Sequence, residues 1–257
     1  METLKIALIQ SQLIWENPEE NRFVFSKKIK AVSKDVDVIV LPEMFTTGFT
    51  MSPENIKEEE GPNTIQWMKK KAAETGAALV GSIVFRDGNK HYNRLCFVKP
   101  DGELFSYDKR HTFTLAGEHE KYTSGNKLTL VTYKGFAFCP LICYDLRFPV
   151  WSRNTDNYDI VLYVANWPEP RINAWDTLLE ARAIENMSYS IGVNRIGLDA
   201  NKHNYCGHSS AYDALGNKLA FSDKEEIIEL VVSKAHIIET RNKLSFLNDR
   251  DQFNLIY

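Results

Sequence analysis

The sequence has few of the features that mark secreted, membrane or nucleic-acid-binding proteins. Its four cysteines are too few for a disulfide framework in 257 residues, which favours a reducing compartment. Its apolar runs, such as residues 160–165, fall far short of the roughly 20 residues of a membrane-spanning helix. With 31 Lys and Arg against 34 Asp and Glu, the net charge of −3 provides no basic surface for nucleic acid or an anionic membrane. Because the chain starts with a strand pattern and no signal peptide, we expect a cytoplasmic protein without such partners.

Linkers and metal motifs are also scarce. No Ser/Gly-rich tract, low-complexity segment or long charge block divides the chain, so we predict a single domain over residues 1–257. Cys139 and Cys143 are separated by three residues, whereas a structural zinc site usually has a closer pair. Residues 203–208 contain two histidines and a cysteine, but we interpret them as a polar loop. We therefore expect no metal and no other cofactor.

The first third of the chain has the pattern strand, helix, strand, helix, strand. Residues 4–9 and 36–41 are apolar runs typical of buried strands. Between them Asn17 and Pro18 are suited to the cap and first turn of a helix. A second apolar stripe predicts a helix that ends at Gly76, followed by a strand over residues 77–85.

The rest of the chain predicts hairpins and a second unit of the same kind. Strands at 93–98 and 103–107 flank a Pro-Asp-Gly turn, and residues 128–132 and 136–142 form another hairpin. Next come a strand at 160–164, a helix striped with apolar residues from 175 to 187, and a strand at 190–196. Residues 211–221 resemble residues 97–105, which indicates an internal two-fold repeat. We therefore predict an α/β fold with two mixed sheets packed face to face and helices outside.

Three predicted strands end in reactive side chains, namely Glu43, Lys109 and Cys143. Singly, each has an ordinary explanation: a solvated loop glutamate, a surface lysine and a small buried cysteine. In α/β sheets, however, ligands bind beyond the carboxyl ends of strands. The three residues together therefore predict a common site.

Cys143 has the surroundings of a nucleophile. Its strand passes directly into a polar turn at residues 144–149, which leads toward a predicted helix containing Val150 and Trp151. Unpaired backbone N–H groups at such a turn lower the pKa of a thiol and can hold an oxyanion. We therefore expect Cys143 to have a lowered pKa.

Three segments resemble the catalytic segments of the nitrilase superfamily of carbon-nitrogen hydrolases, in that family's order. They are Leu-Pro-Glu-Met-Phe at residues 41–45, Tyr-Asp-Lys-Arg-His at 107–111 and Ile-Cys-Tyr-Asp-Leu-Arg-Phe-Pro at 142–149. The resemblance extends from residue 5 to about residue 233. It implies a four-layer α-β-β-α sandwich and an enzyme that needs no cofactor.

The resemblance also implies the roles of the site residues. Glu43, Lys109 and Cys143 correspond to a Glu-Lys-Cys triad, and Glu118 is the best match for a second glutamate, with Glu120 as the alternative. In this mechanism Cys143 attacks an amide carbonyl and forms a thioester, while Glu43 transfers the proton. Lys109 and the backbone N–H of Tyr144 face the oxyanion, and Glu118 orients the substrate and Lys109.

Within the superfamily, residues 44–49, 118–120 and 166–171 most resemble the omega-amidase branch. Those enzymes hydrolyse the terminal amide of small 2-oxo acids such as 2-oxoglutaramate, and release ammonia. The resemblance implies pairing of two sandwiches into a homodimer. An aromatic and apolar tail is a candidate to cover the second copy, and its residues are Phe246, Phe253, Ile256 and Tyr257.

A substrate carboxylate needs a cationic partner, and the planar guanidinium of arginine is well suited to it. Arg147 and Arg171 are the candidates, with Trp167 beside them in the predicted substrate site. For Arg147 we favour a structural ion pair with Asp145 or another acid. For Arg171 the alternative is an ordinary solvated loop arginine.

Three other functions remain open. One is a papain-like hydrolase in which Cys143 pairs with His111 and Asp145. His111 and Lys109 lie only two residues apart, however, and we expect a single one of them to face Cys143. Another is a different amidase of the same superfamily, acting on carbamoyl compounds or on deaminated glutathione. The third is a non-catalytic binding protein with the same fold.

Overall fold

In the computed structural model, residues 2–255 are described, and two six-stranded mixed sheets form their centre. The first sheet has the order β14-β1-β2-β3-β4-β5 and the second the order β13-β12-β9-β8-β7-β6. The strands of the first sheet are β1 (Thr3–Gln10), β2 (Val38–Val40), β3 (Ala78–Asp87), β4 (Lys90–Val98), β5 (Leu104–Asp108) and β14 (Glu226–Ser233). Those of the second are β6 (Val131–Tyr133), β7 (Phe136–Ile142), β8 (Ile160–Ala165), β9 (Tyr189–Asn194), β12 (Ser209–Tyr212) and β13 (Lys218–Ser222).

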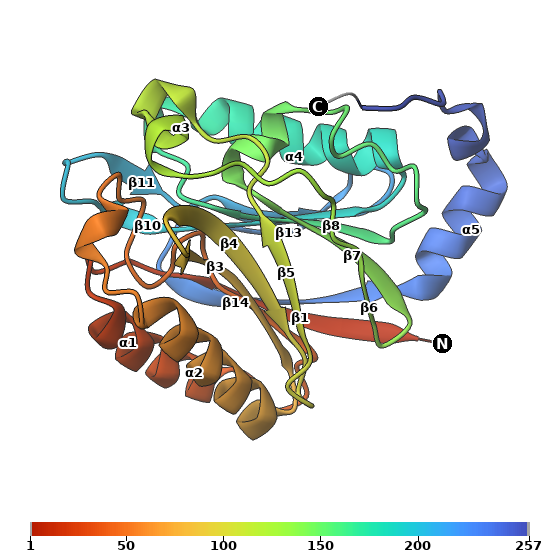
Figure 1. Cartoon of the computed structure of the whole chain (residues 1–257). Helices are drawn as coiled ribbons and strands as arrows, with labels where there is room; N and C mark the ends of the chain where they lie inside the picture. Colours follow the sequence, from red (N-terminus) through yellow and green to blue (C-terminus); the bar gives the residue numbers. More distant parts are fainter. Residues whose placement is uncertain (1, 256–257) are drawn as a thin grey trace.

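Helices cover the outer faces of both sheets. The α-helices are α1 (Pro18–Ala31), α2 (Glu60–Thr75), α3 (Glu118–Lys121), α4 (Ile172–Asn186) and α5 (Lys234–Leu244). Helices α1 and α2 lie below the first sheet, and α4 lies above the second (Figure 1). The inner faces of the two sheets share one apolar core, and a second cluster joins the first sheet to α1 and α2. This arrangement confirms the predicted α-β-β-α sandwich.

The helix boundaries follow from local chemistry. The side chain of Asn17 accepts a hydrogen bond of 3.2 Å from the backbone N–H of Glu20, and Pro18 occupies the first turn of α1. Helix α2 ends at Gly76, whose φ of +71° is a left-handed conformation that glycine adopts without steric cost. Both boundaries were predicted from sequence.

The two sheets have matching topologies. In the first, β1, β2 and β3 are parallel and the β4 and β5 hairpin follows. In the second, β7, β8 and β9 are parallel and the β12 and β13 hairpin follows. The similar segments 97–105 and 211–221 belong to these equivalent hairpins. The order of strands therefore agrees with the predicted two-fold repeat.

Two local predictions were wrong. The predicted strand 190–196 is interrupted: β9 ends at Asn194, and after Arg195 the chain enters a separate two-stranded hairpin, β10 (Ile196–Leu198) and β11 (Asn204–Cys206). Val150 and Trp151 lie in a turn and not in a helix. The cause is Pro149, because a residue before proline avoids the helical region, and Phe148 has φ −116° and ψ 85°.

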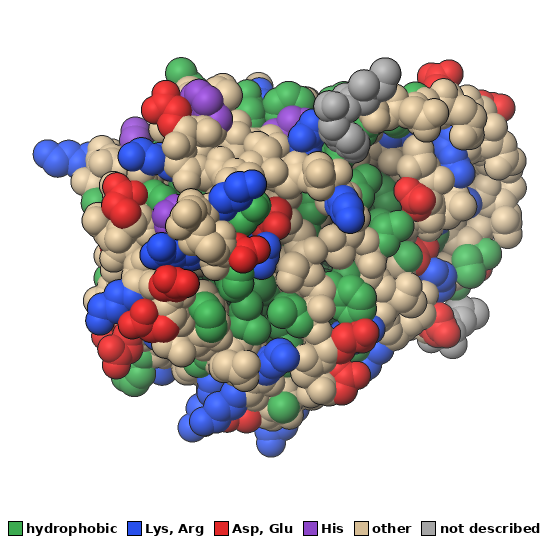
Figure 2. All heavy atoms as spheres, in the orientation of Figure 1, with side chains coloured by type: hydrophobic (Ala, Val, Ile, Leu, Met, Phe, Trp, Pro, Cys, Tyr) green, Lys and Arg blue, Asp and Glu red, His purple; other side chains and the backbone are tan. Residues whose placement is uncertain are grey.

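The surface agrees with the balanced composition. On the face shown in Figure 2, basic and acidic side chains are interspersed around a central group of hydrophobic ones. Among residues 2–255 there is no helix that is both long enough and apolar enough to span a bilayer.

Candidate active site

The carboxyl ends of four strands meet at one end of the sandwich. Lys109 directly follows β5, Cys143 directly follows β7 and Asn166 directly follows β8. Glu43 lies three residues beyond the end of β2, which places it at the same end of the first sheet. Residues more than 100 positions apart in the sequence are thereby brought into contact.

Lys109 lies between two carboxylates. Its Nζ is 2.9 Å from Glu43 Oε1 and 2.9 Å from Glu118 Oε2, and all three side chains are at most 1% exposed. Burial alone would lower the pKa of Lys109, but the charges of Glu118 and Glu43 outweigh it and raise that pKa. Lys109 is therefore held as an ammonium. Of the two candidates for the second glutamate, Glu118 is in this cluster, whereas the side chain of Glu120 is 71% exposed.

Two asparagines that the sequence analysis did not identify complete the cluster. Asn93 Nδ2 donates to Glu43 Oε1 at 2.7 Å and to Glu118 Oε1 at 3.3 Å. The backbone N–H of Asn166 donates to Glu43 Oε2 at 2.8 Å, and its side chain donates to the carbonyl of Glu43 at 2.6 Å. Asn166 follows a predicted strand in the same way as Cys143, so that position was a detectable signal. Asn93 lay within a predicted strand, and no signal in the sequence indicated that it belongs to the site.

Cys143 has a strained backbone and a buried thiol. Its φ is +45°, a conformation that non-glycine residues rarely adopt, and the residue is 8% exposed. Its Sγ lies 3.9 Å from the carbonyl oxygen of Asn166, whose N–H binds Glu43. The expectation of a lowered pKa was wrong: burial, and then the negative charge of Glu43, outweigh Lys109 and raise the pKa of the Cys143 thiol.

The acidic groups of the cluster disfavour the thiolate form of Cys143. Burial raises the pKa of Glu118, and the neighbouring Lys109 opposes that effect. The carboxyl groups of Glu43 and Glu118 both face the single ammonium of Lys109, so a thiolate at Cys143 would add negative charge to a buried cluster that is already rich in acidic groups. The geometry therefore favours a thiol that loses its proton to a nearby base only as it attacks.

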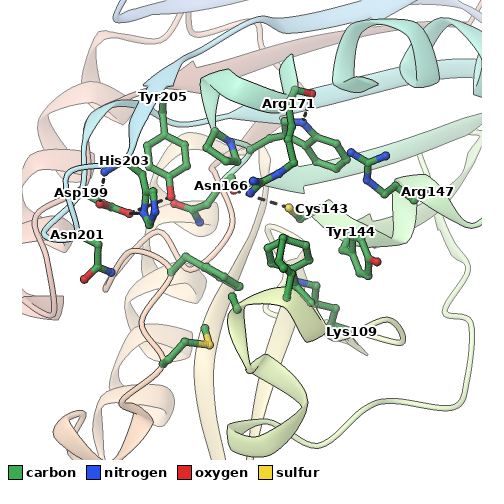
Figure 3. Close-up of a pocket in the computed structure, with 17 residues that line it drawn as sticks. Lys109, Cys143, Tyr144, Arg147, Asn166, Arg171, Asp199, Asn201, His203 and Tyr205 are labelled. Carbon is green, nitrogen blue, oxygen red and sulfur yellow. Dashed lines mark hydrogen bonds and ion pairs between the residues drawn. The ribbon is translucent and has the colours of Figure 1, made fainter. Parts of the chain in front are cut away.

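The cluster opens into a cavity of about 350 Å³. Figure 3 shows Lys109, Cys143 and Tyr144 on one side of it, and Asp199, Asn201 and His203 on the other. The second group comes from the hairpin of β10 and β11 and its connecting loop. Arg147, Asn166, Trp167 and Arg171 also line it, so the predicted substrate residues all line one cavity with the cysteine.

Comparison with known proteins agrees with this geometry. A family model described as carbon-nitrogen hydrolase matches residues 5–242. The chain belongs to the carbon-nitrogen hydrolase family. It is 42% identical over 260 residues to the omega-amidase YafV of Yersinia enterocolitica, covering 100% of both chains. It is 32% identical to the 2-oxoglutaramate amidase of Bacillus subtilis, covering 95% of this chain and 96% of that one.

A solved structure matches the fold of this carbon-nitrogen hydrolase closely. It is XC1258 of Xanthomonas campestris, described as a CN-hydrolase superfamily protein with an arsenic adduct in the active site. The TM-score is 0.96 at 38% identity, covering 99% of this chain and 100% of that one. Together with the sequence relatives, it confirms the predicted superfamily, its omega-amidase-like branch and an enzyme that hydrolyses amides.

The two arginines of the carbon-nitrogen hydrolase cavity lie against aromatic rings. The guanidinium of Arg147 is 4.9 Å from the centre of the Trp167 ring, and that of Arg171 is 5.1 Å from the centre of the Phe113 ring. Among residues 2–255 neither forms an ion pair with a carboxylate. The ion pair that we favoured between Arg147 and Asp145 is therefore absent, because Asp145 accepts its hydrogen bonds from other residues.

His111 is not paired with the cysteine of this carbon-nitrogen hydrolase. Its Nδ1 lies 2.8 Å from Asp145 Oδ1, and its ring stacks on Phe148 with the centres 3.7 Å apart. It lines a separate cavity with Trp151, while Cys143 lines the one described above. The positions do not form a papain-like triad.

The histidines of segment 203–208 point to different partners. His203 Nδ1 lies 3.2 Å from Asp199, and His208 Nδ1 lies 2.9 Å from Asp176. In the described part of the chain, no three His, Cys, Asp or Glu side chains are grouped so as to hold a metal ion.

Proposed function

We propose that this carbon-nitrogen hydrolase is an omega-amidase that hydrolyses the terminal amide of small 2-oxo acids of the 2-oxoglutaramate type. One observation carries the proposal: a buried Glu43, Lys109 and Glu118 cluster lies beside Cys143, and two arginines of the same cavity have no carboxylate partner within residues 2–255. The similarity to omega-amidases and a 2-oxoglutaramate amidase supports it.

In the first half of the reaction, the amide becomes a thioester. The sulfur of Cys143 attacks the amide carbonyl carbon as Glu43 accepts the thiol proton. Lys109 and the backbone N–H of Tyr144 stabilise the oxyanion, each such donor being worth roughly 10²–10³ in rate. The intermediate then collapses: the carbon-nitrogen bond breaks, Glu43 returns the proton to nitrogen, and ammonia leaves.

In the second half, water replaces the sulfur. Glu43 accepts a proton from the water molecule as its oxygen attacks the thioester carbon. The carbon-sulfur bond breaks, Cys143 regains a proton, and the dicarboxylic 2-oxo acid is released. Glu118 keeps Lys109 oriented throughout, because it accepts from Nζ at 2.9 and 3.1 Å.

The charges of the cavity indicate the substrate class. Lys109, Arg147 and Arg171 are cations on its wall, and Asp199 is its single carboxylate among the described lining residues. Asp199 already accepts hydrogen bonds from His203 and Tyr205. A 2-amino acid such as glutamine would bring an ammonium group without a free acidic partner, so the cavity favours the 2-oxo acid.

The direct test is rapid mixing with 2-oxoglutaramate, followed by mass measurement of the intact protein. We expect an acyl group on Cys143 and ammonia release at the same time, with little turnover of glutamine. Turnover of carbamoyl amino acids with release of carbon dioxide, or of deaminated glutathione in preference to the 2-oxo amide, would indicate another amidase of the superfamily. No turnover of any amide would indicate a binding protein.

Arg171→Met tests the recognition of the substrate carboxylate. A charge-assisted hydrogen bond contributes about 1.5–3 kcal/mol, so the KM for 2-oxoglutaramate should rise roughly 10- to 100-fold while kcat changes little. Steady-state kinetics measure both constants. Butyramide, which has no carboxylate, is the matched control and should react equally with both proteins. An equal loss on both amides would mean that Arg171 supports the site and does not bind the carboxylate.

Three further predictions accompany the proposal. We expect two copies of the chain to pair, with the tail residues Phe246 and Phe253, which are 59% and 39% exposed, against the second copy. The other two tail residues, Ile256 and Tyr257, lie outside the described residues. We also expect the enzyme to be cytoplasmic and to need no cofactor, since its own side chains supply nucleophile, base and oxyanion donors.

A further inference from the structure

The buried carboxylate of Asp145 accepts four hydrogen bonds behind the active site. Its Oδ2 accepts from the hydroxyl of Tyr107 at 2.8 Å and from the N–H of Ile142 at 3.1 Å. Its Oδ1 accepts from the N–H of His111 at 3.0 Å and lies 2.8 Å from His111 Nδ1. Asp145 has no exposed surface, and among residues 2–255 it forms no ion pair with a lysine or arginine.

The residues that donate hydrogen bonds to Asp145 lie within two positions of Cys143 or Lys109 in the sequence. Ile142 directly precedes Cys143, and Asp145 itself follows two residues later. Tyr107 and His111 lie two residues before and two residues after Lys109. One carboxylate therefore joins the turn that carries the nucleophile, in the second sheet, to the segment that carries the ammonium, in the first.

We propose that Asp145 is a positioning residue that fixes Cys143 and Lys109 relative to each other. The proposal rests on the amidase function given above, in which both groups must meet one substrate carbonyl. Reacting groups that are misplaced by about 1 Å can cost on the order of 10²-fold in rate. Asp145 does not touch the substrate, because it does not line the cavity of Cys143.

The surroundings of Asp145 limit its movement. The hydroxyl of Tyr107 also accepts from Trp151 Nε1 at 3.0 Å and from the N–H of Arg110 at 3.1 Å. A contribution to folding alone is a poor explanation, because burying a carboxylate without a lysine or arginine partner costs free energy that its hydrogen bonds only offset. The arrangement instead gives both reactive segments a common, rigid reference point.

Asp145→Asn is the decisive variant because it keeps the size of the side chain. A carboxamide has one acceptor oxygen, whereas the two carboxylate oxygens of Asp145 each face a fixed backbone N–H, from Ile142 and from His111. Whichever way the amide turns, its NH₂ group opposes one of these donors. We expect kcat for 2-oxoglutaramate to fall about 100-fold and KM to change less than about threefold.

Asp159→Asn is the matched control. Asp159 is also a buried acid, 2% exposed, and it accepts a hydrogen bond of 2.8 Å from the N–H of Ala137. Asp159 directly precedes β8, so it lies at the opposite end of that strand from Asn166. Its variant should lose thermal stability and keep kcat. If the folded Asp145→Asn protein keeps kcat within about threefold of wild type, or if both variants lose kcat equally, the proposal is overturned.

His111→Ala provides a second variant in case Asp145→Asn does not fold. It removes one of the four donors and keeps the backbone N–H, so kcat should fall roughly three- to tenfold with KM unchanged, and an unchanged kcat would overturn the proposal. The rate of alkylation of Cys143 by iodoacetamide, measured by mass, tests the positioning role of Asp145 independently of the proposed amidase function. If wild type hydrolyses no 2-oxo amide, the proposed function fails. The positioning role then stands if alkylation slows in both variants and falls if it does not.

Discussion

Replacing Cys143 by alanine should abolish amide hydrolysis, with a loss of about 10⁴-fold or more in kcat/KM. Without the sulfur no thioester can form, and water would have to attack the unactivated amide itself. Measurement of ammonia released from 2-oxoglutaramate tests this. Because the side chain is small and 8% exposed, the variant should fold normally.

Cys206→Ala is the control for loss of a free thiol. Cys206 lies on β11, is partly exposed and is not among the residues that line the cavity of Cys143. That variant should keep the activity of wild type, and its protein should still take up an acyl group. A folded Cys143→Ala protein with full amidase activity would contradict the whole catalytic scheme.

Glu43→Gln should lower kcat by about 10²- to 10⁴-fold, which is typical for loss of a general base. The carboxylate oxygens of Glu43 accept from Lys109, Asn93 and the N–H of Asn166, so the NH₂ group of a glutamine would also meet donors. Steady-state kinetics measure the loss. Glu120→Gln, at an exposed position on α3, should leave kcat unchanged.

The pH dependence of thiol alkylation gives the same variant a second readout. Because the pKa of Cys143 is raised, its thiolate forms only above the usual range of about 8.5. In wild type the rate of reaction with iodoacetamide should therefore rise about tenfold per pH unit up to pH 9 without a plateau. In Glu43→Gln, which loses a charge that raises this pKa, the same rise should begin at a lower pH. A plateau below about pH 7 would instead indicate a preformed thiolate and imidazolium pair, as in papain-like enzymes.

The fold was largely predictable from local signals. Asn17 and Gly76 are caps whose effect depends on a few neighbouring atoms, and both helices begin or end where predicted. The errors arose where local signals competed. An apolar pattern ran through Arg195 although the strand ends before it, and Pro149 overrode the helical pattern around Trp151.

The site was predictable in part. Glu43, Lys109 and Cys143 follow strands, and the general rule that such ends share one edge of a sheet was enough to group them. The partners of each group were not predictable. The choice of Glu118 over Glu120, the contacts of Asn93 and the absence of an ion pair at Arg147 depend on which side chains meet across the two sheets.

The sequence by itself determined the family and most of the order of strands and helices, and it grouped Glu43, Lys109 and Cys143 as candidates for one site, because short segments and their spacing specify these features. Only the tertiary structure decided the electrostatics of the site. The raised pKa of Cys143 results from burial and from a carboxylate 100 residues away in the sequence, and the common support by Asp145 joins segments of different sheets. Desolvation and charge interactions depend on distance in space, which no local pattern specifies.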